Sequence, residues 1–195
     1  MGRRAPRGPD WRNFDDTACG AGLHLPEPLN GRSYRGALDI RIDRAGVWHY
    51  NGSAIRRPDM VRLFAASLMR AGDGRYWLVT PTEMGHITVE DAPFVTVSLK
   101  IVGEGDDQIL RFTTNVDDVV TLCEDTPLIM RACRVSGVTT PYIRVRDGLE
   151  ARVQRNHYYE LVEHGAVMEL DGEAVLGVWS EGCFFPMGAI ADPDA

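Results

Sequence analysis

The stretch PYIRVRDGLEARVQRNHYYELVE, residues 141–163, contains the pattern that decides the fold. Apolar and charged residues alternate over its first part, which is the period of a half-buried strand. Asp147-Gly148 then provides a two-residue turn, so residues 141–153 are predicted to form a β-hairpin. Asn156 is placed to cap a helix that runs to about His164, because a glycine follows and favours a helix end. The stretch therefore predicts a hairpin followed by a helix.

The first half of the chain contains the same order of elements. Leu38, Ile40 and Ile42 alternate with charged residues and predict a strand, and residues 47–50 predict its return strand. A helix with one apolar face follows, from Pro58 to about residue 69. Matching positions keep a constant offset of 98 residues: Ile55 with Val153, Arg57 with Arg155, and Leu63 with Leu161. A constant offset indicates duplication, the alternative being a chance similarity of two hairpin–helix units.

The remaining sequence predicts more strands than helices, so the expected fold class is α+β. It consists of two similar hairpin-plus-helix motifs from duplication, with a larger antiparallel sheet in the C-terminal half. Three parts are expected along the chain: a flexible basic tail over 1–18, an N-terminal α+β domain over 19–83, and a C-terminal β-rich domain over 84–190.

Composition excludes several classes of function. The net charge is −7, so no general attraction to nucleic acid is expected. No apolar run approaches the roughly 18–20 residues needed to cross a bilayer, and the first residues lack the apolar stretch of a secretory signal. A cytoplasmic protein with no membrane partner and four free thiols is therefore expected. No cysteine or histidine spacing indicates a metal site, and whether the protein uses a cofactor is left unknown by the sequence.

Arginine side chains supply a candidate ligand site. Lys100 is the only lysine, so arginine is used at every other lysine-or-arginine position. The planar arginine guanidinium suits the binding of phosphate and carboxylate groups. Arg144 and Arg146 fall on one strand face, Arg152 on the return strand and Arg155 at the helix start. Such a cluster could hold a phosphate through bidentate contacts and backbone amides. The alternative is a solvated strand face whose arginines pair with nearby glutamates.

No catalytic residue set is predicted. The sequence contains no nucleophile elbow, zinc-protease helix, phosphate loop or dinucleotide loop. Adjacent Glu90 and Asp91 offer the alternative of a hydrolase or transferase that recruits a metal. Successive strand residues point to opposite faces, however, which argues against a shared site. Asp91 equally fits a role in fixing the turn before Pro93 or in hydrogen bonding at an interface.

Six blocks of the sequence occur in the same order in one known family. They are GVWHYNGSAIRRPDMVRLFAASL, DGRYWLVTPTE, ITVEDAPFV, FTTNVDD, PYIRVRDGLEARVQRNHYYELVE and LGVWSEGCFFPMG. Over roughly residues 36–188 the chain thus resembles the bacterial domain-of-unknown-function family numbered 1285. The resemblance implies two similar motifs, a C-terminal half superficially like a pleckstrin-homology domain, and a ligand site between the halves. It also implies a nucleotide-based ligand and a role in signal transduction, in oxidative stress, without any catalytic residues.

The leading hypothesis is a ligand-binding or sensor protein rather than an enzyme. A nucleotide-based small molecule would lie in the cleft between the two halves, held by arginines, oriented by an amide and a carboxylate, and covered by an aromatic wall. This requires the segments around Arg57 and Arg155 to face one shared groove. A further alternative is a protein-interaction module that uses sheet edges, with an unknown partner. Eight residues are assigned to the ligand site: Arg57, Asp91, Phe94, Asn115, Arg144, Arg152, Arg155 and Trp179.

Overall fold

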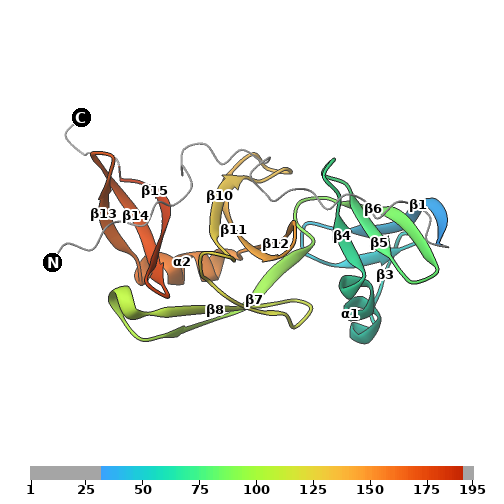
Figure 1. The fold of residues 1–195 in the computed structure, drawn as a ribbon, viewed down its shortest axis with the longest axis horizontal. Helices are drawn as coiled ribbons and strands as arrows, with labels where there is room; N and C mark the ends of the chain where they lie inside the picture. The colour runs from blue at the N-terminus through green and yellow to red at the C-terminus, as the bar shows by residue number, and fades with distance from the viewer. Residues whose placement is uncertain (1–31, 191–195) are drawn as a thin grey trace.

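The computed structural model describes residues 32–190, in which two α-helices pack against three β-sheets (Figure 1). The predicted tail over 1–18 lies outside the described residues, as do residues 19–31 of the predicted N-terminal domain. The described part of the chain is mostly β-structure, consistent with a mixed α+β class. None of its helices has the length and apolar character needed to cross a membrane.

The first sheet has six strands in the order β3-β2-β1-β6-β5-β4. They are β1 (Ser33–Ile42), β2 (Trp48–Tyr50), β3 (Ser53–Ala54), β4 (Leu68–Arg70), β5 (Tyr76–Val79) and β6 (Glu83–Val89). The alternation of Leu38, Ile40 and Ile42 places their side chains together on the core face of β1. β1 and β2 form the predicted antiparallel hairpin, whereas β1 and β6 pair in parallel.

The second sheet also has six strands, in the order β10-β11-β12-β7-β8-β9. They are β7 (Phe94–Val102), β8 (Ile109–Thr114), β9 (Val119–Thr121), β10 (Leu128–Ala132), β11 (Thr139–Arg146) and β12 (Leu149–Arg152), and the short 3-10 helix η2 (Gly105–Asp107) joins β7 to β8. The pairs are antiparallel as expected, except that β12 and β7 run in parallel. This parallel pair could not be read from local patterns, because β7 and β12 lie far apart in the sequence.

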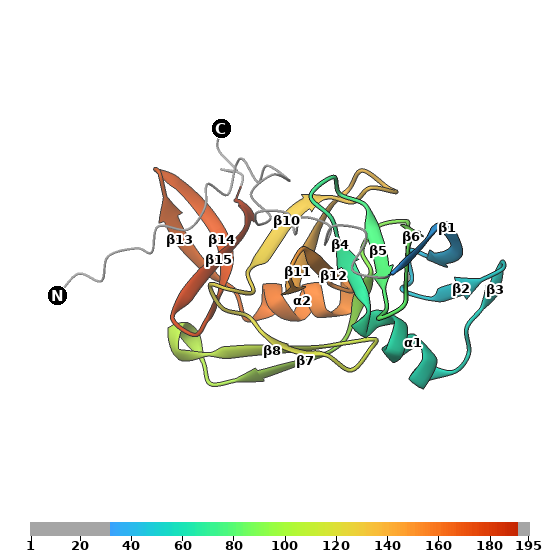
Figure 2. The ribbon, with the colours of Figure 1, turned by 45° about the vertical axis from the view of Figure 1, so that its right-hand side comes forward.

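A small third sheet and the two helices complete the fold. The sheet has the order β13-β14-β15, formed by β13 (Ala166–Leu170), β14 (Glu173–Ser180) and β15 (Cys183–Ala189). Helix α1 (Pro58–Ala66) lies below the first sheet, and α2 (Arg155–Glu163) lies beside β7 and β14 (Figures 1 and 2). The two helices therefore serve different sheets.

The two halves share a common order of elements. In each, an antiparallel strand pair leads to a helix and then to a three-stranded meander: β1–β2, α1 and β4–β6 in the first half, β11–β12, α2 and β13–β15 in the second. The two meanders differ in the sheet to which they belong. In the first half β6 pairs with β1 and extends one sheet, whereas in the second half the meander forms a sheet of its own.

Both helix predictions need a correction at one end. The first helix ends at Ala66, because Leu68 and Met69 pair with Leu78 and Trp77 as strand β4. The second helix begins one residue before Asn156, and its N-cap is Gln154 without a side-chain cap bond. Backbone hydrogen bonding explains the second case, since the Gln154 amide donates to Thr96 Oγ1 at 3.0 Å and fixes the helix start. Asn156 is therefore not the predicted cap.

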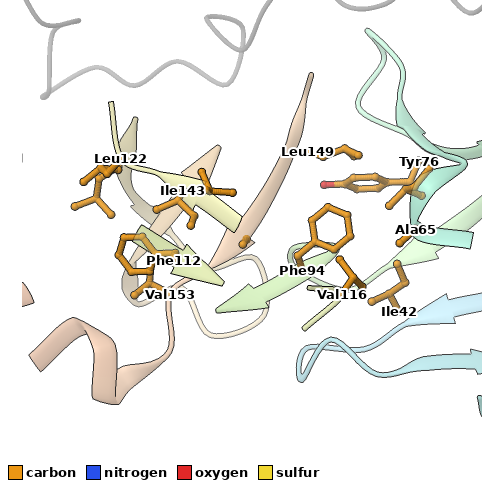
Figure 3. Close-up of a cluster of buried hydrophobic side chains, with 14 of the residues drawn as sticks. Ile42, Ala65, Tyr76, Phe94, Phe112, Val116, Leu122, Ile143, Leu149 and Val153 are labelled. Atoms are coloured by element: carbon orange, nitrogen blue, oxygen red, sulfur yellow. The ribbon is translucent and has the colours of Figure 1, made fainter. Parts of the chain in front are cut away.

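One hydrophobic core runs through both halves. We call residues 32–92 the first unit and residues 93–190 the second unit; the first sheet continues past the expected boundary at residue 83, because β6 pairs with both β1 and β5. Figure 3 shows Phe94 and Val116 of the second unit beside Ile42 and Ala65 of the first, and all four side chains belong to one buried cluster. Burial of shared apolar surface thus holds the two units together.

Candidate functional site

A cleft opens where the β1–β2 turn, the start of α1 and the turn after β8 meet. Its volume is about 230 Å³, below the roughly 300–1,000 Å³ of sites that enclose a whole drug-sized ligand. The cleft therefore suits a small ligand or one end of a larger one. Its lining residues are Gly46, Val47, Trp48, Ile55, Arg56, Pro58, Val61, Arg62 and Asn115. All of them except Asn115 belong to the first unit.

The turn between β1 and β2 forms one wall of the cleft, and Asp43 holds its shape. Asp43 Oδ1 accepts hydrogen bonds from the amides of Ala45 and Val47, at 2.9 and 3.0 Å. His49 Nε2 lies 2.8 Å from Asp43 Oδ2. Burial alone would raise the pKa of Asp43, but the hydrogen bonds from His49 and the two amides outweigh it and lower the pKa. Asp43 is thus an ionised carboxylate that fixes the turn.

Asn115 lines the cleft and connects the two units. Its Nδ2 donates to the Gly46 carbonyl at 2.9 Å, and its Oδ1 accepts the Val95 amide at 3.1 Å. Gly46 has a φ of +78°, and an added Cβ would lie 2.9 Å from Asn115 Nδ2. Glycine is therefore required at this position for both its conformation and its close contact. Asn115 therefore lies at the junction of the two units, and its assignment to a ligand site stays a prediction.

The cationic side chains of the cleft differ in their partners. Arg62 contacts the carboxylates of Asp59 and Asp117 and is thereby neutralised. Arg56 is exposed and forms no hydrogen bond or ion pair with any of residues 32–190. Arg57, its neighbour, is the N-cap residue of α1 and does not line the cleft. Arg56 is thus the cleft arginine available to an anion.

Trp48 also lines the cleft, and its indole N–H is an unused hydrogen-bond donor. Its side chain is only 1% exposed and stacks on Phe64, with ring centroids 6.2 Å apart. The buried indole Nε1 has no hydrogen-bond acceptor in the described part of the chain. A buried donor without a partner is unfavourable by roughly 1–3 kcal/mol, and an acceptor on a ligand would remove that penalty.

Two of the predicted site residues, Asp91 and Arg152, meet in a second polar cluster and do not line the cleft. Arg152 Nε lies 3.4 Å from Oδ2 of fully buried Asp91, and Arg152 Nη2 donates to the Arg44 carbonyl at 2.8 Å. Tyr142 OH donates to Asp91 Oδ1 at 2.8 Å. Burial raises the pKa of Tyr142, and the hydrogen bond to the Asp91 carboxylate adds to this. The cluster crosses the boundary between the units, so Asp91 has the interface hydrogen-bonding role considered from the sequence.

Glu90 and Asp91, the two carboxylates of the enzyme alternative, have different partners. Glu90 contacts Arg41 and accepts the Arg44 amide at 2.9 Å, whereas Asp91 faces Tyr142 and Arg152. Both carboxylates therefore already have donors within the protein, and they lie in different surroundings. Among residues 32–190 no group of three or more His, Cys, Asp or Glu side chains is arranged to hold a metal ion.

The other predicted site residues lie elsewhere. Phe94 is a core side chain beneath the Arg146 guanidinium, 5.3 Å from its ring centroid, and Trp179 packs edge-on against Phe184. Arg144 is half-buried on β11, and Arg155 is exposed and hydrogen-bonds Tyr159. Of the eight assigned residues the cleft contains Asn115. Arg56 and Trp48 were not assigned, because the repeat offset favoured Arg57 and a strand tryptophan fits an ordinary core position.

The fold and the cleft define a two-domain α+β protein whose candidate ligand site lies at the junction of the domains. The model described as "Domain of unknown function (DUF1285), N-terminal domain" matches residues 31–92. The model described as "Protein of unknown function (DUF1285), C-terminal domain" matches residues 93–187. The chain therefore belongs to the DUF1285 family, as the sequence blocks predicted. The regions matched by the two family models meet between residues 92 and 93, which is the boundary between the first and second units.

Two solved structures are similar to the chain. A DUF1285 family protein from Silicibacter pomeroyi DSS-3 is 37% identical, with a TM-score of 0.73, over 89% of this chain and 93% of that one. A DUF1285 family protein from Shewanella baltica OS155 is 24% identical, with a TM-score of 0.47, over 65% of this chain and 92% of that one. None of the curated proteins compared with the chain matches it.

Proposed function

We propose that this protein is a ligand-binding sensor that takes a small phosphate-bearing molecule, nucleotide-based in class, in the cleft between its two domains. One observation carries the proposal: an arginine without a partner lines the same cleft as Trp48, whose buried indole N–H has no acceptor among the described residues. Arg56 would bind the anion, and Trp48 would donate to an acceptor of the ligand. An anion would contact Arg56 rather than Arg62, because the Arg62 guanidinium already faces the carboxylates of Asp59 and Asp117.

The size of the cleft indicates how such a ligand would lie. About 230 Å³ accommodates a phosphate and a sugar, and a base would then extend towards the mouth. The position of the cleft supports the proposed signalling role, because a ligand held against Asn115 would contact both domains and could change how they pack together. The likeness of the C-terminal half to a pleckstrin-homology domain and the origin of the repeat by duplication remain part of this proposal.

A matched pair of variants tests the proposal. Arg56→Gln removes the cleft guanidinium, and Arg57→Gln removes the neighbouring exposed one, which does not line the cleft. Nucleoside monophosphates are screened by thermal shift, because a ligand that binds only the folded state raises its melting temperature. The affinity of AMP, and of adenosine as the uncharged control, is then measured by calorimetry. We expect the wild-type chain to bind AMP and to bind adenosine more weakly. Arg56→Gln should lower the affinity for AMP at least tenfold, and Arg57→Gln should change that affinity less than twofold.

The expected changes in affinity follow from the energy of a charge-assisted hydrogen bond. A charge-assisted hydrogen bond contributes about 1.5–3 kcal/mol, and 1.4 kcal/mol corresponds to tenfold in affinity. Equal losses in the two variants would locate the anion outside the cleft. Failure of every phosphate-bearing compound to bind the wild-type chain would refute the proposal.

A further inference from the structure

Two cysteines from distant parts of the sequence lie at the junction of the second and third sheets. Cys123 follows β9, and Cys183 is the first residue of β15. Both are free and half-buried, whereas Cys133 is also free but only 1% exposed. Cys123 and Cys183 are thus accessible to a small reagent, and Cys133 provides a protected reference.

Backbone contacts bring the two segments together. Ser180 is the register partner of Cys183 in the β14–β15 hairpin. Its buried Oγ donates to the carbonyl of Leu122, the residue before Cys123, at 2.6 Å, and accepts the Leu110 amide at 3.0 Å. The hairpin end that carries Cys183 is therefore fixed against the chain at Cys123.

The surroundings of the two sulfur atoms show that they share one environment. Cys123 Sγ lies 3.1 Å from Thr126 Oγ1, in a turn closed by the Thr126 amide and the Cys123 carbonyl at 3.2 Å. Glu124, which belongs to that same turn, also acts on the pKa of the Cys183 thiol. Burial raises the pKa of the Cys183 thiol, and the negative charges of Glu124, Cys123 and Glu181 raise it further.

We propose that Cys123 and Cys183 form an oxidation site that closes into an intramolecular disulfide when the protein meets a peroxide. One thiolate attacks a peroxide oxygen, the O–O bond breaks, and the departing hydroxide leaves as water, which gives a sulfenic acid. The second thiol attacks the sulfenic sulfur, the S–S bond forms, and the hydroxyl leaves as water with the thiol proton. Two thiols and one hydrogen peroxide thus yield one disulfide and two waters.

The bond would have two measurable consequences. It would fasten the turn after β9 to the start of β15 and close a long loop, so the oxidised chain should unfold at a higher temperature. The raised pKa keeps the Cys183 sulfur protonated near neutral pH, and the thiolate is the reactive form. Disulfide formation should therefore accelerate as the pH rises from 7 to 9.

Peptide mapping tests the proposal on the full chain. Cys19→Ser is used as the background, so that the cysteine outside the described residues cannot exchange. Trypsin then places each remaining cysteine in its own peptide: Cys123 in Phe112–Arg131, Cys133 in Ala132–Arg134 and Cys183 in Asn156–Ala195. After treatment with hydrogen peroxide, non-reducing mass spectrometry should show the first and third peptides joined and lighter than their sum by two hydrogen atoms.

The controls separate this pairing from unspecific oxidation. Cys133→Ser should keep the joined species, whereas Cys123→Ser and Cys183→Ser should each abolish it. The background chain alone decides the question if a serine variant does not fold. Oxidation that yields only unlinked sulfinic acids, or a joined species that includes the Cys133 peptide as often as the other two, would overturn the proposal. These readouts contain no ligand, so they are independent of the proposed binding function.

Discussion

Replacing Asn115 by alanine should loosen the contact between the two domains at the cleft. The change removes the acceptor of the Val95 amide and the donor to the Gly46 carbonyl. Val95 is 3% exposed, so its amide would be left buried without a partner, which costs about 1–3 kcal/mol. The lost bond to Gly46 adds about 1 kcal/mol, and the expected decrease in the free energy of unfolding is about 2–4 kcal/mol.

Calorimetry and urea unfolding measure this loss. For a chain of this size 1 kcal/mol shifts the melting temperature by about 2–4 °C, so Asn115→Ala should melt roughly 5–15 °C lower. Asn156→Ala is the matched control, because Asn156 is exposed within α2 and its side chain is not the helix cap. It should change the melting temperature by less than about 2 °C. Similar shifts in the two variants would refute the reasoning about Asn115.

Three other substitutions probe the framework of the site. Burial lowers the pKa of the His157 imidazole in the folded chain, whereas in the unfolded chain the imidazole takes up a proton near pH 6.5. The free energy of unfolding should therefore decrease as the pH drops below that value. His157→Gln should make this decrease smaller between pH 7 and 5, as measured by urea titrations. Gly46→Ala should lower the free energy of unfolding by at least about 1 kcal/mol more than Gly52→Ala in the same assay. Both glycines have a positive φ, so the backbone strain is alike, but only the Cβ added at Gly46 meets other atoms; nothing lies within 4 Å of the one added at Gly52. Asp91→Ala should lower the free energy of unfolding by about 3–5 kcal/mol, because it breaks a buried ion pair. Glu90→Ala should lower it by about 1 kcal/mol or less, because the Glu90 side chain is 34% exposed. Equal losses in the two variants would contradict the burial of Asp91.

Local patterns in the sequence predicted the hairpins and helices well. The alternation around Asp147-Gly148 and the proline at the start of α1 act over a few residues, and both elements form as expected. The end of α1 was less predictable. Leu68 and Met69 fit an apolar helix face as well as a strand, and only their pairing with β5 decides between the two. The parallel pair of β1 and β6 joins segments far apart in the sequence and has no local signal.

The candidate site was predictable in kind but not in its residues. Arginine, asparagine and a junction between repeated halves were expected, and Asn115 lies at that junction. The choice between Arg56 and Arg57 depends on how the chain enters α1, because adjacent residues in extended backbone point in opposite directions. The free indole donor of Trp48 was not predictable, since a missing hydrogen bond is a property of the packed structure.

Titration of the 15N-labelled protein with AMP, followed through the indole N–H resonance of Trp48, tests the occupied cleft most directly. A Phe substitution at Trp48 assigns that resonance among those of the four tryptophans. We predict that it moves downfield and saturates as AMP is added, because its unpaired N–H gains an acceptor. An indole resonance that stays in place while AMP binds elsewhere, or that is unchanged at every concentration, would contradict a ligand in this cleft.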